Sequence, residues 1–150
     1  MAFDAPSLKG RALRLLSQRE HSRAELERKL ARYEEEPGTL ARALDELAAA
    51  NFISEARVVQ SVLHQRASRM GALRVRQELQ QKGIAPEAIA GAVAQMQDTE
   101  LERAREVWRR RFGAAPQDVG ERARQVRFLM ARGFASGTVA RVVKGDFDEE

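Results

Sequence analysis

Residues 74–84 read RVRQELQQKGI, and fifty positions later residues 124–134 read RQVRFLMARGF. Both stretches carry a Leu, then a basic residue directly followed by Gly, and then a large apolar residue. A Gly just after a helical stretch is typical of the left-handed residue that ends a helix, because Gly has no Cβ to collide with the backbone. The repeated stretch therefore predicts two helices that end in the same way.

The repetition extends well beyond these two stretches. A shift of 50 positions matches Leu79 with Leu129 and Gly83 with Gly133, and a shift of 49 in the other direction matches Leu79 with Leu30. Helix–turn–helix pairs are expected near residues 22–50, 72–97 and 122–144, joined by longer helices near 54–69 and 98–112 and preceded by a helix at 8–18. A period of about 50 residues is typical of units that cannot bury their apolar faces alone and must stack.

The fold class that follows is all-α. Apolar residues recur at helical spacing along the chain and no window alternates with a period of two, so no strand is expected. Ser22 with Glu25 fits a capping box, Ser54 fits an N-cap, and Pro86 fits a first helical turn. We predict an elongated tandem array of three-helix, helix-turn-helix-like repeats. It forms one domain over residues 1–150, with units at about 8–50, 51–97 and 98–145 and an acidic tail at 146–150.

The composition excludes several classes of protein. The chain of 150 residues has no Cys, so disulfides and thiolate metal sites are excluded. It shows neither an apolar run of about 18 residues nor a secretory signal, so we expect a cytoplasmic protein without a membrane segment. Two isolated His residues do not make a metal site, and neither a phosphate-binding Gly-rich loop nor a nucleophile elbow occurs. We expect no enzyme activity, no metal and no cofactor.

The basic residues are unevenly distributed along the chain, whose formal net charge is +4. Residues 66–82 hold five Lys or Arg against one Glu, and residues 103–144 hold eleven against three acidic residues, whereas residues 1–50 hold nine of each sign. A basic stripe on a helical scaffold can neutralise phosphates or meet an acidic protein surface. The residues expected to bind a partner or DNA are Arg66, Arg69, Arg74, Arg76, Lys82, Arg109, Arg110, Arg124, Arg127 and Arg132.

Four stretches, taken in order, resemble a known family. HSRAELERKL at 21–30, LDELAAANFIS at 44–54, RVRQELQQKGIAPEAIAGAV at 74–93 and RARQVRFLMARGFASGTVARVV at 122–143 are similar to the RecX family of bacterial recombination regulators. The likeness covers roughly residues 8–145. The chain departs from the family pattern at Asn51, where Gly is common, and at Ser54-Glu55 and Val58-Val59. Asn tolerates a left-handed conformation, so the first departure is mild.

The resemblance implies a partner and a function. RecX proteins are built of tandem three-helix repeats and lie in the groove of the active RecA recombinase filament on single-stranded DNA. They block its ATP hydrolysis, strand exchange and co-protease activity, which connects them with DNA recombination, DNA repair and the SOS response. For this chain the resemblance implies binding to the RecA filament and to single-stranded DNA, directly or through the filament, and we expect a monomer. The leading contacts are Arg74, Arg76, Arg124 and Arg127, because we expect them at the starts of equivalent helices.

Two other interpretations stay open. A stand-alone helix-turn-helix-like DNA-binding protein would need a recognition helix with base-reading side chains at its start. The segments after Gly83 and Gly133 read IAPEAIAGAV and FASGTVARVV, with almost no Arg, Asn or Gln near their starts, which weakens this alternative. A generic helical adaptor differs from a RecA regulator only in its partner, and charge and periodicity fit it equally well.

Overall fold

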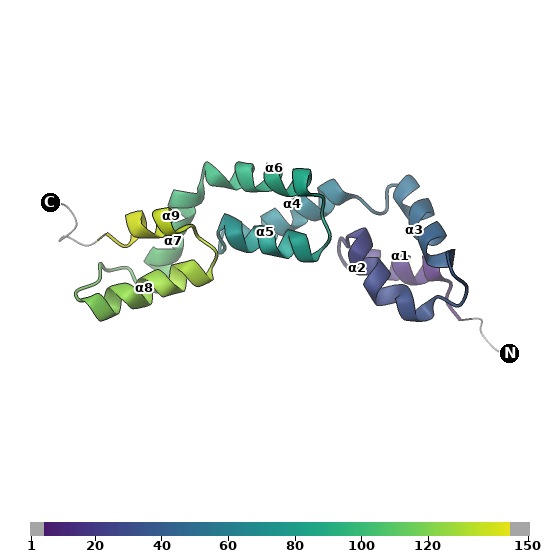
Figure 1. The fold of residues 1–150 in the computed structure, drawn as a ribbon, viewed down its shortest axis with the longest axis horizontal. Helices are drawn as coiled ribbons and strands as arrows, with labels where there is room; N and C mark the ends of the chain where they lie inside the picture. Colours follow the sequence, from purple (N-terminus) through teal and green to yellow (C-terminus); the bar gives the residue numbers. More distant parts are fainter. Residues whose placement is uncertain (1–4, 145–150) are drawn as a thin grey trace.

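The computed structural model describes residues 5–144, and all regular structure in this part of the chain is helical. Its elements, labelled in Figure 1, are α1 (Leu8–Gln18), α2 (Arg23–Leu30), the 3₁₀ helix η1 (Ala31–Tyr33), α3 (Thr39–Ala49), α4 (Glu55–Arg66), α5 (Ala72–Gln81), α6 (Pro86–Gln97), α7 (Glu100–Arg111), α8 (Val119–Ala131) and α9 (Ser136–Val142). The all-α prediction is confirmed. No helix between residues 5 and 144 is long and apolar enough to cross a membrane. The acidic tail expected at 146–150 lies outside the described residues.

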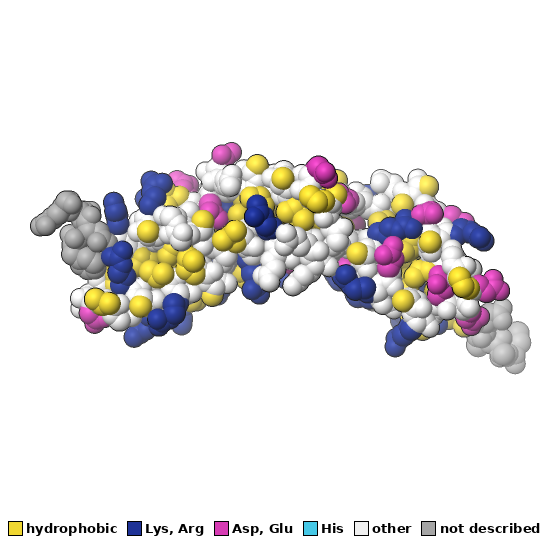
Figure 2. Space-filling view, viewed as in Figure 1, with side chains coloured by type: hydrophobic (Ala, Val, Ile, Leu, Met, Phe, Trp, Pro, Cys, Tyr) yellow, Lys and Arg dark blue, Asp and Glu magenta, His cyan; other side chains and the backbone are white. Residues whose placement is uncertain are grey.

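The helices form three units of three, α1–α3, α4–α6 and α7–α9, which we call the first, second and third units. Figure 1 shows the units following one another along the long axis of the molecule, and Figure 2 shows a gently curved outline. Each unit has a separate core of fully buried side chains: Leu26, Leu44 and Leu47 in the first, Val75 and Leu79 in the second, and Leu129, Phe134 and Val143 in the third. The predicted elongated array of three-helix repeats is therefore confirmed.

Three helices, α2, α4 and α6, begin at residues that local chemistry favours in a first turn or as a cap. Ser22 Oγ accepts a hydrogen bond from the Glu25 amide at 3.1 Å, and Glu25 Oε1 accepts one from the Ser22 amide at 3.1 Å, which forms the predicted capping box of α2. The side chain of Ser54 caps α4, and Pro86 is the first residue of α6. The three start signals read from the sequence are all confirmed.

The start of α8 differs from the expectation. This helix begins at Val119, because Asp118 Oδ1 accepts a hydrogen bond from the Glu121 amide at 2.7 Å and so caps an additional turn. Arg124 and Arg127 consequently lie in the middle of α8 and not at its start. The expectation that the leading arginines begin equivalent helices is therefore wrong for α8.

The two repeated Gly residues end α5 and α8 in the left-handed conformation, with φ of 72° at Gly83 and 88° at Gly133. The next amide reaches back to the Leu carbonyl in both cases, from Ile84 to Leu79 at 3.1 Å and from Phe134 to Leu129 at 3.3 Å. This is the Schellman pattern, in which the residue after Gly also packs on the Leu side. Asn51 ends α3 in the same conformation, with φ of 66°, as expected for Asn.

The same two Gly residues also form the junctions between units. A Cβ built on Gly83 would lie 2.7 Å from the Cβ of Ala24 in α2. A Cβ built on Gly133 would lie 2.4 Å from the Cβ of Arg74 in α5 and 2.5 Å from its backbone nitrogen. Ala24 and Arg74 are also 50 positions apart. The repeated stretch therefore has two purposes: each Gly ends a helix, and it lets that end rest on the first turn of a helix in the preceding unit.

The junction between the second and third units also contains backbone hydrogen bonds. The Gly71 amide donates to the carbonyl of Arg132 at 2.7 Å, and the Leu73 amide donates to the carbonyl of Gly133 at 3.1 Å. A Cβ on Gly71 would lie 2.4 Å from the carbonyl oxygen of Gly133. The main chains of the two units therefore touch directly, which only Gly at both positions permits.

Two side chains of α7 fasten the third unit to the second. The buried carboxylate of Glu100 accepts a hydrogen bond from the Ala72 amide at 2.9 Å, which satisfies a free donor in the first turn of α5. Arg103 donates to the carbonyls of Ala67 and Met70, at 2.9 and 2.8 Å, and so holds the loop between α4 and α5. Burial lowers the pKa of Arg103. This junction thus contains polar side-chain contacts as well as the close approach of the two main chains, unlike the three apolar cores.

Candidate functional site

Four of the expected contact residues are exposed on two neighbouring helices: Arg74 and Arg76 on α5, and Arg124 and Arg127 on α8. Figure 1 shows α8, α5 and α2 along the lower edge of the array, and Figure 2 shows Lys and Arg side chains projecting from this edge. No ion pair joins any of the four arginines to an acidic side chain within residues 5–144. Their charges are therefore available to an anionic partner.

Two other expected contact residues are engaged in ion pairs inside the protein. Arg66 Nε lies 3.1 Å from Glu78 Oε2, which joins α4 to α5. Lys82 Nζ lies 3.1 Å from Glu25 Oε1, across the junction of the first and second units, and only 17% of the Lys82 side chain is exposed. The structure therefore places Arg66 and Lys82 in contacts that hold helices and units together.

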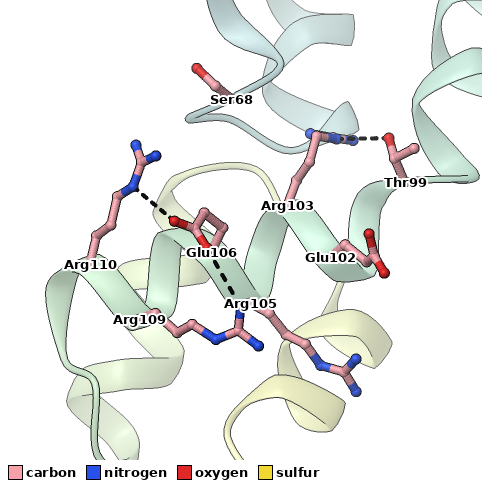
Figure 3. Close-up of a pocket in the computed structure, with 8 residues that line it drawn as sticks. All are labelled: Ser68, Thr99, Glu102, Arg103, Arg105, Glu106, Arg109 and Arg110. Carbon is pink, nitrogen blue, oxygen red and sulfur yellow. Dashed lines mark hydrogen bonds and ion pairs between the residues drawn. The ribbon is translucent and has the colours of Figure 1, made fainter.

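Arg109 and Arg110 face a groove of about 430 Å³ beside α7, drawn in Figure 3. Both arginines share the carboxylate of Glu106, with Arg109 Nη1 at 3.6 Å and Arg110 Nε at 3.1 Å. Their side chains are 65% and 70% exposed, so these pairs are weak and solvent-screened. In Figure 3 the guanidinium of Arg105 points away from Glu106. The carboxylate offsets part of the positive charge that the sequence indicates for this helix.

A second groove, of about 250 Å³, gathers three expected contact residues from distant parts of the chain. Arg69 from the loop after α4, Arg110 from α7 and Arg132 from the end of α8 all line it. Phe128 also lines it, with the guanidinium of Arg132 5.0 Å and that of Arg111 5.4 Å from its ring centroid. No acidic residue lines this groove, which we call the Phe128 groove. It is a basic surface at the junction of the second and third units.

The chemistry of these surfaces suits binding. Arginine forks make charge-assisted hydrogen bonds to phosphate or carboxylate oxygens, and an aromatic ring beside them adds an apolar contact. In the described part of the chain, no group of His, Cys, Asp and Glu could hold a metal ion. His64 is exposed, while His21 is buried, and burial lowers its pKa. The described residues thus offer anion-binding surfaces on a helical support.

Arg111 and Phe128 were not among the expected contact residues. Three consecutive Arg at 109–111 point in different directions around a helix, and spacing alone does not tell which one meets a neighbouring ring. Trp108 is partly buried against the third core, and its Nε1 donates to Gln125 Oε1 at 2.8 Å. Gln125 itself is buried, an uncommon position for a polar side chain, and this hydrogen bond explains how it is tolerated.

Comparisons with known proteins find the same family along the whole chain. Family models described as the first, second and third three-helix domains of RecX match residues 9–47, 54–93 and 98–143. A regulatory protein RecX of Leptothrix cholodnii is 54% identical over 146 residues, which are 96% of this chain and 93% of that protein. A regulatory protein RecX of Ralstonia nicotianae is 49% identical, over 93% of this chain and 87% of that protein.

Solved structures show the same fold. The crystal structure of RecX from Lactobacillus salivarius superposes with a TM-score of 0.75 at 16% identity, over 91% of this chain and 92% of that chain. A second crystal structure, of a regulatory protein RecX, gives a TM-score of 0.76 at 21% identity, over 90% of this chain and 70% of that chain. At such low identity the likeness concerns the arrangement of helices and not individual contact residues.

Proposed function

The chain belongs to the RecX family, and from this membership we propose that it is a regulatory protein that binds the RecA recombinase filament on single-stranded DNA. Bound there, it inhibits the ATPase, strand-exchange and co-protease activities of RecA. It acts through binding, in the cytoplasm and as a monomer, without a reaction or a cofactor of its own.

The observation that carries this proposal is the exposure of Arg74, Arg76, Arg124 and Arg127 on α5 and α8, without an acidic ion-pair partner among residues 5–144. Arg74 and Arg124 are 50 positions apart, so equivalent helices of two units present the same charge. A ligand with repeated negative charge, such as a DNA strand or a helical filament with acidic walls, can meet both helices at once. The Phe128 groove lies at the junction of the same two units and extends the basic surface.

The elongated shape supports a second part of the proposal. Three units in a row reach further than a compact domain of 150 residues would, and we propose that one molecule spans more than one RecA subunit. Inhibition would then require less than one copy of this protein per filament subunit. The curved outline in Figure 2 suits a ligand that is itself curved.

The ATPase rate of a preassembled RecA filament tests the proposal. The wild type should inhibit ATP hydrolysis, and the quadruple variant Arg74→Glu, Arg76→Glu, Arg124→Glu, Arg127→Glu should not. Arg42→Glu is the control, since Arg42 is exposed on α3, away from these helices. Circular dichroism checks that all variants stay helical. Inhibition by the quadruple variant equal to that by the wild type would remove these arginines from the mechanism, and no inhibition by the wild type would remove the function.

A further inference from the structure

A third basic groove lies in the first unit, which contains none of the ten expected contact residues. It has a volume of about 440 Å³ and runs between α1, the end of α2 and η1. Four cationic side chains line it, and no acidic residue does: Arg11, Arg14, Lys29 and Arg32. We call it the first-unit groove.

The sequence conceals this groove, because residues 1–50 hold equal numbers of acidic and basic residues. The structure separates the two signs. Five carboxylates of the first unit pair with other cations: Glu46 with Lys9, Glu27 and Asp45 with Arg23, Glu25 with Arg19 and Lys82, and Glu20 with Arg57. The remaining acidic residues of this unit within residues 5–144, Glu34, Glu35 and Glu36, do not line the groove, and Glu34 accepts a hydrogen bond from the Leu40 amide at 2.8 Å. Within residues 5–144, none of the four groove cations has a carboxylate partner. A locally neutral segment thus has a strongly basic face.

Tyr33 organises two of the groove cations. The guanidinium of Arg11 lies 3.7 Å from the ring centroid, and that of Arg32 lies 4.7 Å from it. Arg32 Nη2 also donates a hydrogen bond to the Tyr33 hydroxyl at 2.6 Å. Cation–π contacts leave the outward N–H groups of a guanidinium free to bind an anion. The ring therefore positions two guanidinium groups, one from α1 and one from η1, without neutralising them.

A third groove cation is positioned by a neutral side chain. Lys29 Nζ lies 3.2 Å from Nε2 of the buried His21, whose Nδ1 lies 3.0 Å from the carbonyl oxygen of Arg19. With the proton on Nδ1 donated to that carbonyl, Nε2 accepts from the Lys29 ammonium. His21 thus positions the Lys29 side chain beside the groove, without a carboxylate taking part.

We propose that the first-unit groove docks an acidic peptide segment that also carries apolar side chains, contributed by a protein partner. Charge complementarity calls for carboxylates, since four cations surround the groove and no acid does. Apolar side chains fit its floor, which includes Leu15, Leu30 and Pro6. A nucleic-acid backbone would leave this apolar floor uncovered, and the Tyr33 ring already stacks with arginines and is not offered to a base. The inference goes beyond the RecA proposal, whose contact residues lie in the other two units.

Fluorescence anisotropy with the full chain tests this assignment. The probe is a fluorescein-labelled peptide in which Glu and Asp alternate with Leu and Phe, and the same peptide with Gln and Asn is the uncharged control. Arg14→Glu reverses an exposed groove charge, and Arg42→Glu is its matched control on α3. We expect Arg14→Glu to weaken binding of the acidic probe by about fivefold or more, and Arg42→Glu to change it by less than about twofold. Arg32→Glu serves as a second groove variant.

Three results would overturn the assignment. The acidic probe does not bind; or it binds the Arg14→Glu and Arg32→Glu variants as tightly as the wild type; or single-stranded oligothymidine displaces it and loses affinity in the same two variants to the same extent. The last result would make the groove a nucleic-acid surface. Because these measurements use no RecA, their failure is distinct from a failure of the ATPase experiment.

Discussion

Gly133 touches Arg74 so closely that no side chain fits between them: a Cβ on Gly133 would lie 2.5 Å from the backbone nitrogen and 2.9 Å from the Cα of Arg74. Gly83 and Ala24 repeat this relationship one unit earlier, although there only a side-chain atom is approached. The same Gly also requires the left-handed conformation, so two independent restraints coincide at one residue.

Gly133→Ala should therefore destabilise the protein by about 2 kcal/mol or more, because strain at positive φ adds to a collision with the main chain. Gly91→Ala, in the middle of α6 with nothing within 4 Å of the added Cβ, should instead stabilise it by about 0.5–1 kcal/mol. Urea unfolding of both variants measures the difference. Equal stability of the two variants would mean that the backbone at the junction moves apart to accommodate the added Cβ at little cost.

Truncation of either repeated Leu should be costly. Leu79 and Leu129 are both fully buried in their respective cores, so Leu79→Ala and Leu129→Ala should each lower the free energy of unfolding by about 2–5 kcal/mol. Leu73→Ala is the control, since Leu73 is 50% exposed and its truncation should cost no more than about 0.5 kcal/mol. If both core variants had the same free energy of unfolding as the wild type, the alignment of Leu79 with Leu129 as equivalent core positions would be wrong.

Glu25 should make stability depend on acid pH. Burial alone would raise its pKa, but hydrogen bonds from Arg19, from the Ser22 amide and from Lys82 prevail and lower the pKa from 4.5 to about 2. The ionised carboxylate therefore stabilises the folded state fully above pH 4.5, and this contribution is lost as the pH falls from 4.5 towards 2.

Glu25→Gln tests this dependence. The variant should lose about 2–3 kcal/mol at neutral pH and should lose less further stability than the wild type on acidification. Glu27→Gln is the matched control, because Glu27 is half exposed and its pair with Arg23 contributes about 0.5 kcal/mol or less. Urea unfolding at neutral pH and near the folded pKa gives both differences; parallel acid curves for wild type and Glu25→Gln would contradict the assignment.

Salt should weaken binding to the filament if the arginines of α5 and α8 contact phosphates. Each phosphate that they neutralise contributes roughly 0.7–0.9 to the slope of log affinity against log salt concentration. The quadruple Glu variant should show a distinctly shallower slope, and Arg42→Glu should keep the slope of the wild type. Anisotropy with the labelled filament over a salt series measures this, and identical slopes would place the arginines away from phosphate.

The helical fold was predictable because its signals are local. The spacing of Leu residues, the capping box at Ser22 and the Gly residues after α5 and α8 each act within a few residues, so the sequence displays them directly. The expected start of α8 was about one turn too late, because Asp118 was not identified from the sequence as an N-cap.

The candidate sites were less predictable, because charge pairing is set by the tertiary structure. Lys82 is 57 positions from Glu25 along the chain, and nothing local indicates that they meet. Arg69, Arg110 and Arg132 form one groove although three different segments supply them. Counting charges along residues 1–50 also gave no sign of the first-unit groove, since only the folded structure places the acidic residues away from its lining, five of them in ion pairs.

Each unit has its own apolar core, and the units meet at small junctions, so the array should bend more easily between units than within them. Bending within a unit would open a whole close-packed core, whereas bending between units strains the local contacts at Gly83 and Gly133 and a few hydrogen bonds and ion pairs, such as those of Glu100 and Lys82. Elastic compliance is therefore concentrated at two places along the length. The array can therefore adjust its curvature to a helical ligand of fixed pitch while each three-helix unit keeps its shape.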